Sequence, residues 1–168
     1  QAACVLPVSE GMVVHTNTKR VRYARKVNLE LILSNHNGDC NTCIRSGNCE
    51  LQKLARDFNV DGIRYKGENI EYDLDLKSPS IVRDANKCIV CRRCESVCGN
   101  VQTVHAIGAT NRGFKTMIKP TFERSIAEVN CINCGQCIVN CPVGALREKD
   151  DTEKVWDALS DPDKYVVL

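Results

Sequence analysis

Large aromatic side chains are scarce in this chain. Phenylalanine, tyrosine and tryptophan together make up 5% of its residues, so a core built on packed rings is not available to it. No apolar run approaches the roughly 18 residues that span a bilayer, so no membrane span is expected. The net charge is only +2, which gives no indication of a nucleic-acid partner. Stability must therefore come from something other than aromatic packing.

Cysteine, in contrast, is present in excess. Twelve cysteines occur among 168 residues, a density that indicates either a disulfide scaffold or a metal protein. Most of them follow C-x2-C spacing, in which close neighbours rarely form structural disulfides and metal binding is favoured. Thiols at this density also predict a reducing, cytoplasmic location. We expect metal centres to supply part of the core.

Two cysteine runs form an internal repeat. CIVCRRCESVC (88–98) and CINCGQCIVNC (131–141) have identical cysteine spacing, and each cysteine of the second lies 43 residues after its counterpart. Both read C-x2-C-x2-C-x3-C, the bacterial ferredoxin spacing in which three cysteines hold one 4Fe–4S cube and the fourth ligates the other. The predicted ligand sets are Cys88, Cys91, Cys94 and Cys141 for one cube, and Cys131, Cys134, Cys137 and Cys98 for the other.

Zinc is the main alternative for these runs, because C-x2-C pairs also build zinc ribbons. A zinc site needs only two such pairs and has no use for a third cysteine at the same spacing, so the duplicated pattern favours iron–sulfur cubes. Gly99 and Gly135 are expected to let the backbone approach the cubes closely. The second run is followed by proline and the first by Gly99, a departure that removes no ligand.

A third group of donors lies in residues 36–49, HNGDCNTCIRSGNC. Cys40, Cys43 and Cys49 would hold three corners of a 4Fe–4S cube, and His36 lies close enough to supply the fourth ligand. A neutral imidazole makes a cluster less anionic, which eases its reduction. A Cys3His zinc site fits the same ligand count. His36 can also be a helix-terminal residue favoured by the macrodipole, so the residues alone leave three interpretations open.

Hydrophobic periodicity and turn residues predict the order of the local elements. Three helices are predicted. The first follows the capping residues 16–18 and extends to about Asn35, the second begins at or near Cys49, and the third covers about 152–159. The predicted strands are 5–8 and 12–14 around a turn at 9–11, a hairpin within 106–119 turning at 111–113, and 165–168. Residues 60–87 have the composition of a polar connector. Val155, Trp156 and Leu159 are expected to form the buried face of the last helix.

The order of His36, Cys40, Cys43 and Cys49 followed by the two repeats resembles the accessory iron–sulfur domain of the larger iron-only (FeFe) hydrogenases. Related electron-input subunits of complex I and some formate dehydrogenases share its histidine-ligated cube. The resemblance implies that His36 is a cluster ligand. It covers essentially the whole chain and implies three 4Fe–4S clusters.

Both ends carry the same resemblance. QAAC followed by VSEGMVV resembles the end of the family's plant-type 2Fe–2S domain, which implies that Cys4 is the last ligand of a 2Fe–2S cluster. VWDALSDPDKYVVL resembles the linker helix and first strand of the hydrogenase catalytic domain. Both ends are therefore expected to belong to larger domains that continue beyond this sequence.

The expected fold class is α+β, a small helical His/Cys3 cluster-binding unit followed by a bicluster 2×(4Fe–4S) ferredoxin-like domain. The implied domains are the end of the 2Fe–2S domain (1–15), the histidine-ligated 4Fe–4S domain (16–72) and the bicluster domain (73–150). Residues 151–168 would be the linker helix and the start of the catalytic domain.

The resemblance implies an electron relay that feeds or drains the H-cluster of an FeFe hydrogenase, the site of reversible H2 oxidation. The cysteines of the H-cluster are not in this sequence, and no catalytic residue is predicted in the chain itself. Expected partners are ferredoxin, flavin-containing NAD(P)H-oxidising subunits, or both, together with the rest of the hydrogenase.

Two other functions stay open on the residues. The first is an electron-input subunit of another oxidoreductase, such as an NAD(P)-linked formate dehydrogenase or a complex I-like enzyme. The second is a zinc-stabilised interaction module, which would be colourless where an iron–sulfur protein is brown. The basic segment KRVRYARK at 19–26 fits either a solvated helix face or a docking patch for an acidic electron carrier.

Overall fold

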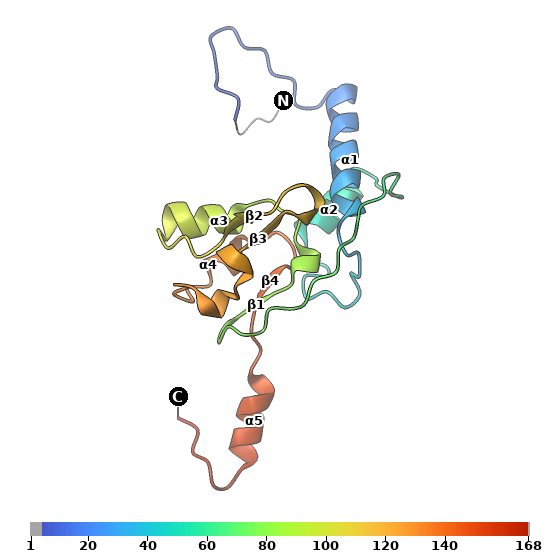
Figure 1. Cartoon of the computed structure of the whole chain (residues 1–168). Helices are drawn as coiled ribbons and strands as arrows, with labels where there is room; N and C mark the ends of the chain where they lie inside the picture. Colours follow the sequence, from blue (N-terminus) through green and yellow to red (C-terminus); the bar gives the residue numbers. More distant parts are fainter. Residues whose placement is uncertain (1–4, 168) are drawn as a thin grey trace.

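Two helices project from opposite ends of the molecule, with the cysteine-rich region between them (Figure 1). The computed structural model describes residues 5–167, so Cys4 and its predicted role lie outside the described residues. The α-helices are α1 (Lys19–Ser34), α2 (Glu50–Asp57), α3 (Arg93–Ser96), α4 (Gln136–Asn140) and α5 (Thr152–Ser160). The strands are β1 (Ile81–Arg83), β2 (Gly108–Thr110), β3 (Met117–Lys119) and β4 (Leu146–Glu148).

The sequence repeat produces a repeat of structure. One half runs β1, α3, β2 and the other runs β3, α4, β4, and each cysteine run begins after the first strand of its half and extends through the helix. Strand β1 pairs antiparallel with β4, and β2 pairs antiparallel with β3. Each sheet therefore takes one strand from each half, which joins the two halves into one α+β unit.

The two cysteine loops also share an unusual backbone conformation. Val90 and its counterpart Asn133 have φ angles of 54° and 55°, and Arg92 and Gly135 have φ angles of 61° and 71°. A positive φ is strained for a β-branched residue such as Val90. Left-handed residues next to right-handed ones turn successive N–H groups inward and form concavities that favour anions. The matching φ angles show that the two cysteine loops have the same backbone shape although their side chains differ.

The predicted helices α1 and α2 and the predicted hairpin are confirmed. The side chain of Thr18 accepts a hydrogen bond from the backbone N–H of Val21, 3.3 Å away, and begins α1. Helix α2 begins directly after Cys49, and residues 108–119 form the β2–β3 hairpin. Apart from the short strand β1, residues 60–83 are almost without regular structure, as a connector should be.

The residue after each fourth cysteine decides how its helix ends. Helix α4 stops at Asn140, and Cys141 is extended because the following Pro142 disfavours a helical conformation before it. Gly99 imposes no such limit, so the chain continues past Cys98 as a π-helix, Val97–Val101. The missing proline therefore alters the backbone around Cys98.

Both ends of the chain differ from the strand predictions. Residues 5–8 and 12–14 form no strand, although the predicted turn between them is present and the N–H of Met12 donates to the carbonyl of Ser9. Residues 165–167 form no strand either. A strand requires a hydrogen-bonded neighbour, and neither segment has one within the described part of the chain.

Helix α5 forms as predicted, but its apolar face is not buried. Val155, Trp156 and Leu159 are 45%, 62% and 57% exposed. The prediction of a buried face is wrong because α5 extends away from the body and none of the other described elements covers this face (Figure 1).

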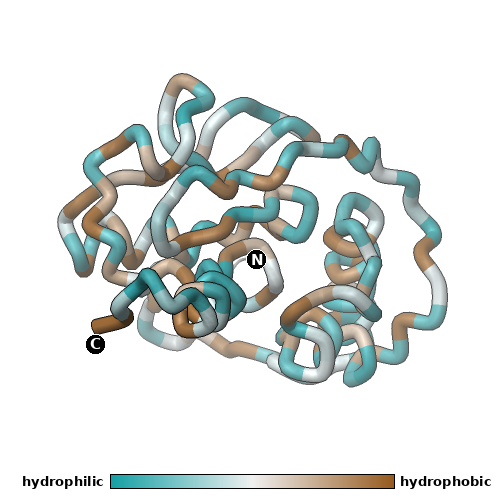
Figure 2. The backbone as a smooth tube through the Cα atoms, turned by 90° about the horizontal axis from the view of Figure 1, so that it is seen from below, coloured by the Kyte–Doolittle hydropathy of each residue, from teal (hydrophilic) through white to brown (hydrophobic). Residues whose placement is uncertain are grey.

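None of the described helices is long and apolar enough to cross a membrane. Hydrophobic residues are interspersed with hydrophilic ones along the backbone (Figure 2).

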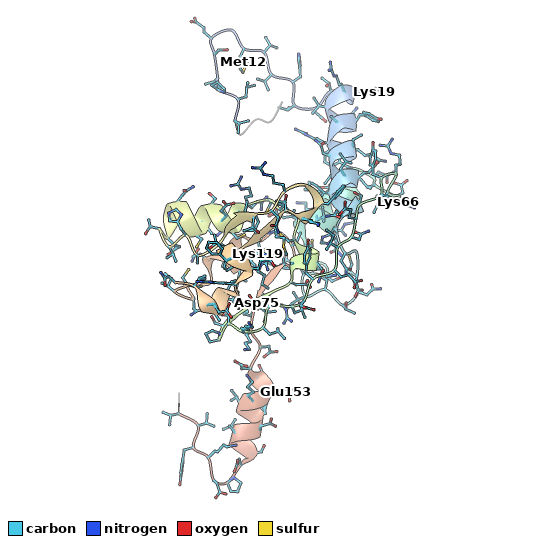
Figure 3. All side chains as sticks on the ribbon, in the orientation of Figure 1. Met12, Lys19, Lys66, Asp75, Lys119 and Glu153 are labelled. Carbon is cyan, nitrogen blue, oxygen red and sulfur yellow. The ribbon has the colours of Figure 1, made fainter. Side chains whose placement is uncertain are left out.

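Asp75 joins the connector to the second half of the repeat (Figure 3). Its carboxylate accepts hydrogen bonds from Ser125 Oγ at 2.6 Å, from the N–H of Ile126 at 3.1 Å and from the N–H of Lys77 at 3.3 Å. Burial raises the pKa of Asp75, but these three bonds outweigh burial and leave its pKa lowered. The ionised carboxylate is therefore the form that holds the segment in place.

We expect Asp75→Asn to lower the free energy of unfolding by about 1–2 kcal/mol at neutral pH, allowing for the partial exposure of the group. A depressed folded pKa gives stability that is present above the unfolded pKa of about 4 and is lost below it. The difference should therefore be constant between about pH 6 and 8, where thermal unfolding would be compared. The exposed Asp73→Asn is the control, and an equal loss in both variants would contradict this role.

Candidate metal centres

Three cavities each gather one of the predicted ligand sets. The first quartet lines the first cavity and comprises His36, Cys40, Cys43 and Cys49. The second quartet lines the second cavity and comprises Cys88, Cys91, Cys94 and Cys141. The third quartet lines the third cavity and comprises Cys98, Cys131, Cys134 and Cys137. Each repeat therefore sends its fourth cysteine to the cavity of the other repeat.

The first cavity is the most spacious, with a volume of about 800 Å³, and a short series of turns shapes it. The N–H of Cys40 donates to the carbonyl of Gly38 at 2.7 Å, and the N–H of Cys43 donates to that of Cys40 at 3.3 Å. Cys49 enters from the residue preceding α2. Lys87 reaches in from the repeat region, where its ammonium donates to the carbonyls of Asn37 and Asp39.

His36 has the properties of a ligand rather than of a solvated helix terminus. Its Nδ1 atom is buried and has no hydrogen-bond partner in the described part of the chain. Burial lowers the pKa of His36, and the charge of Lys87 lowers it further, so the neutral imidazole is favoured. A buried nitrogen without a partner carries a desolvation penalty that a bond to a metal would remove. The side chain therefore fits a cluster ligand.

The second cavity holds thiols that resist ionisation in the absence of metal. Burial raises the pKa of Cys94 to about 12, and the neighbouring Cys88, Cys141 and Cys91 raise it further. Burial likewise raises the pKa of Cys88. A coordinating metal displaces the proton and holds such thiols as thiolates. Four thiolates around one cavity would repel one another, and the positive charge of bound iron would offset that repulsion.

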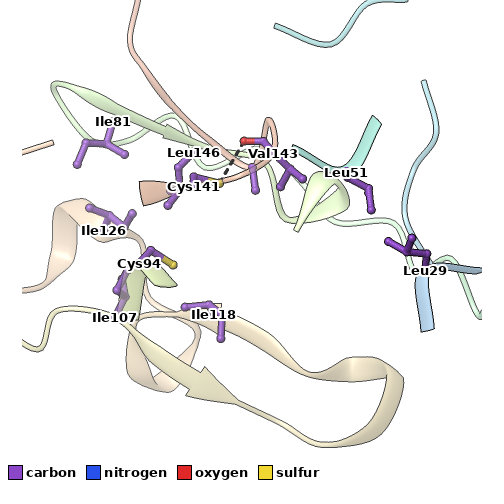
Figure 4. Close-up of a cluster of buried hydrophobic side chains, with 11 residues drawn as sticks. Leu29, Leu51, Ile81, Cys94, Ile107, Ile118, Ile126, Cys141, Val143 and Leu146 are labelled. Atoms are coloured by element: carbon purple, nitrogen blue, oxygen red, sulfur yellow. Dashed lines mark hydrogen bonds between the residues drawn. The ribbon is translucent and has the colours of Figure 1, made fainter. Parts of the chain in front are cut away.

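The third cavity repeats this arrangement. Burial raises the pKa of Cys137 to about 11, and Cys131 and Cys134 add to the effect. Ile107 and Ile126 line both the second and the third cavity and form the wall between them. The buried cluster brings together Cys94, Ile107, Ile118 and Ile126 (Figure 4). In the same cluster the Sγ of Cys141 donates a hydrogen bond to the carbonyl of Val143.

The first and second cavities are joined through the chain that follows Cys141. A Cβ atom on Gly144 would lie 2.7 Å from the Sγ of Cys43, so glycine allows this approach while Cys43 keeps its present rotamer. The guanidinium of Arg45 donates to the carbonyl of Cys141 at 3.2 Å, and the N–H of Glu50 donates to that of Pro142 at 3.1 Å. These contacts fix the N-terminal unit against the repeat.

Gly99, predicted to let the backbone approach a cube, packs against a histidine ring. A Cβ atom there would lie 2.9 Å from the imidazole ring of His105, so the glycine makes room for that ring. Gly135 lines the third cavity, and no atom of the described residues lies within 4 Å of its missing Cβ. Its φ of 71° is one that glycine adopts without strain.

Two charged residues of these sites could not be found from the sequence. Arg83 lines the second cavity and Lys87 the first, and both are buried. Lys87 is adjacent to Cys88, a weak signal, whereas Arg83 reaches its cavity only because β1 pairs with β4.

The cysteines of the described region are all unpaired. The eleven cysteines among residues 5–167 form no disulfide. Within the same residues, no three His, Cys, Asp or Glu side chains are placed to hold one metal ion. The donors are instead distributed around the walls of the three cavities.

Two family models match the chain in the regions of these cavities. Residues 25–64 match the NADH-ubiquinone oxidoreductase-G iron-sulfur binding region. Residues 87–145 match the 4Fe-4S dicluster domain.

Curated relatives match over most or nearly all of the chain. It is 47% identical over 167 residues to the NADP-reducing hydrogenase subunit HndD of Solidesulfovibrio fructosivorans, covering 99% of this chain and 28% of that protein. It is 34% identical over 168 residues to iron hydrogenase 1 of Clostridium pasteurianum, covering 99% of this chain and 29% of that protein. It is 35% identical over 150 residues to the mitochondrial 78 kDa subunit of NADH-ubiquinone oxidoreductase of Candida albicans, covering 88% of this chain and 20% of that protein.

A solved structure shares the fold. A chain in the crystal structure of an NAD+-reducing [NiFe]-hydrogenase in the H2-reduced state matches with a TM-score of 0.81 at 26% identity, covering 89% of this chain and 64% of that one. The chain thus spans less than a third of the length of the curated relatives described above. Over most of its length the chain is therefore similar to subunits of hydrogenases and of NADH-ubiquinone oxidoreductase, and two of its regions match iron–sulfur binding families.

Proposed function

We propose that the three quartets hold three 4Fe–4S clusters and that the chain relays single electrons through them to a catalytic site elsewhere in the complete protein. The observation that carries this proposal is the grouping of twelve donor side chains into three cavities, with Cys98 and Cys141 exchanged between the repeats. When bound, such clusters supply one-electron carriers. The mixed helix and strand fold then serves as a bicluster ferredoxin-like domain preceded by a histidine-ligated unit.

The residues of the chain set the positions and surroundings of the clusters. Ile107 and Ile126 separate the second and third sites with apolar side chains that exclude water. Gly144 brings the backbone that follows Cys141 against Cys43, which keeps the first and second sites close. Fixed separation and controlled burial are what a protein contributes to electron transfer between bound cofactors.

For the complete protein we propose an FeFe hydrogenase that interconverts H2 with protons and electrons. The hydrogenase relatives matched over 99% of this chain support this assignment. In such a protein Cys4 would be the last ligand of a 2Fe–2S cluster within residues 1–15, and the H-cluster would lie in the domain that residues 151–168 begin. Residues 16–72 and 73–150 would be the two cluster domains between them.

The proposed partners are other redox proteins. Ferredoxin, or flavin-containing subunits that oxidise NAD(P)H, would exchange electrons with the chain. The NADP-reducing hydrogenase and the NADH-ubiquinone oxidoreductase among its relatives support partners of this kind. The high thiol content favours a reducing, cytoplasmic location.

A second candidate is an electron-input subunit of a complex I-like enzyme. The match of residues 25–64 to the NADH-ubiquinone oxidoreductase-G region favours it. The sequence beyond Leu168 in the complete protein discriminates between the two, because a hydrogenase of the FeFe class requires the cysteines of the H-cluster there.

The test is an anaerobic iron and acid-labile sulfide count with EPR of the reduced protein. Three cubes predict about twelve iron and about twelve sulfide per chain. His36→Ala should alter the EPR signal of one cluster alone, because only the first quartet contains this imidazole. The matched control is His15→Ala, since His15 is exposed and lines none of the three cavities.

Two results would contradict parts of this proposal. About eight iron with one zinc would make the first quartet a structural zinc site. An unchanged spectrum in an iron-replete His36→Ala protein would exclude His36 as a ligand.

A further inference from the structure

Arg83 is a buried cation that the described residues do not neutralise. It is the last residue of β1 and is only 9% exposed. It takes part in none of the ion pairs found among residues 5–167. A buried charge is normally paired or bound to a metal centre. Its presence beside a proposed cluster therefore requires an explanation.

The side chain of Arg83 is held in place at one end of its guanidinium. Its backbone N–H donates to the carbonyl of Asp75, and its carbonyl accepts from the backbone N–H of Asp75. Its Nε donates to the carbonyl of Ile118 at 2.9 Å. Its Nη2 is buried and has no hydrogen-bond partner among residues 5–167. The nearby carboxylate of Asp75 is already engaged by Ser125 and Ile126. A rigidly placed donor thus retains unused hydrogen-bonding capacity.

Arg83, the residue with this unused hydrogen-bond donor, lines the second cavity together with Cys88, Cys91, Cys94 and Cys141. Burial lowers the pKa of Arg83, while Cys88, Asp75, Cys94 and Asp84 oppose that effect. Arg83 therefore lies on the same cavity wall as the four sulfurs of the second quartet.

The duplicated half of the structure provides an internal comparison. Lys119 is the last residue of β3, which precedes the second cysteine run as β1 precedes the first. Lys119 is also buried, but its Nζ lies 2.8 Å from Glu123 Oε1, which neutralises it. Lys119 does not line the third cavity, and no charged side chain of the described residues does. The second cavity is also lined by Asp84 and by Arg92, which pairs with Glu95 at 2.6 Å. The two cavities therefore match in their thiols and differ in the charged groups around them, among which Arg83 is the buried cation without an ion pair in the described residues.

We propose that Arg83 raises the reduction potential of the cluster held by the second quartet above that of the cluster held by the third. This inference rests on the cluster assignment proposed above. Reduction adds one electron, and hence one negative charge, to a cluster. A neighbouring cation and a hydrogen-bond donor stabilise that added charge. The third cavity lacks a counterpart of Arg83, so an electron shared between the two clusters resides mainly on the second.

The test is an EPR-monitored potentiometric titration of the iron-loaded protein with dithionite as the one-electron reductant. The exposed counterparts Cys91→Ser and Cys134→Ser first assign the signals to the second and third quartets. In Arg83→Met the share of the electron on the second cluster should fall about tenfold relative to the third, which is about 59 mV for a one-electron couple. Lys119→Met, the matched control, should leave both potentials unchanged.

Two results would overturn the inference. One is an unchanged second potential in iron-replete Arg83→Met, and the other is an equal lowering of both potentials. If Arg83→Met fails to load iron, Arg83→Gln decides by the same criteria, because its amide can still donate to Ile118. A wild-type iron count that rules out two cubes in the repeat would instead refute the proposed function, and the count is made before any variant is compared.

Discussion

Removing the iron under anaerobic conditions is expected to unfold residues 73–150 rather than leave a folded, colourless protein. The hydrophobic cluster of this region is assembled around the cavities. Its members that line the second or third cavity are Ile81, Cys94, Ile107, Ile118, Ile126, Cys141, Val143, Ala145 and Leu146. Without the clusters, these side chains would surround a hollow instead of packing on one another.

The secondary structure of this region offers little independent support. Each of the two sheets has two strands of three residues, and two-stranded sheets are marginally stable in water. Metal binding contributes about 10–16 kcal/mol in small structural zinc sites. The whole stability of a native domain is about 5–15 kcal/mol. Loss of two clusters should therefore exceed what the polypeptide alone provides.

Amide hydrogen exchange before and after chelation measures this effect. The N–H of Asp84, which donates to the carbonyl of Ala145, and the N–H of Lys149, which donates to the carbonyl of Ser80, hold the ends of β1 and β4 together and should lose their protection. Rebuilding the clusters with ferrous iron and sulfide should restore it, which controls for irreversible damage. Retention of protection in the iron-free protein would show that the repeat folds without its clusters.

Local patterns predicted the elements that are determined by nearby residues. The cap at Thr18 and the periodic apolar residues after Cys49 identify α1 and α2 because capping and amphipathicity act within a few residues. The cysteine spacing also indicated which thiols meet, since the same loop occurs twice.

Features that depend on distant contacts were not predictable in the same way. The apolar residues of 5–8 suggested a strand, but a strand forms only with a partner. Trp156 fits the apolar face of an amphipathic helix, yet periodicity does not say whether anything covers that face. Gly99 was linked to a cube by its position after Cys98, whereas its neighbour in space is His105. Arg83 carries no local signal at all, because its environment is created by strand pairing across the repeat.

Gly144→Ala is expected to remove or strongly perturb the cluster of the first quartet while leaving the other two in place. The added Cβ would lie 2.7 Å from the Sγ of Cys43, closer than non-bonded atoms approach. A free thiol could rotate away, but a thiolate bound to a cluster is fixed in position. Overpacking of this kind costs about 1–3 kcal/mol when the surroundings are rigid.

The backbone on the other side of this contact is also restrained. The carbonyl of Pro142, two residues before Gly144, accepts the N–H of Glu50, and the carbonyl of Cys141 accepts from Arg45. Residue 144 therefore cannot retreat without loosening the contacts that join the two units. The strain falls on Cys43, the ligand nearest to the substitution.

Iron analysis and EPR decide the outcome. Gly144→Ala should contain about eight iron instead of about twelve, or show a changed signal for the first cluster alone. Gly38→Ala is the matched control, because Gly38 lines the same cavity but has no atom within 4 Å of its missing Cβ. Full iron content and an unchanged spectrum in Gly144→Ala would mean that Cys43 is not held by a cluster. Equal losses in both variants would mean that the loop of the first quartet tolerates no added methyl group, whatever its contacts.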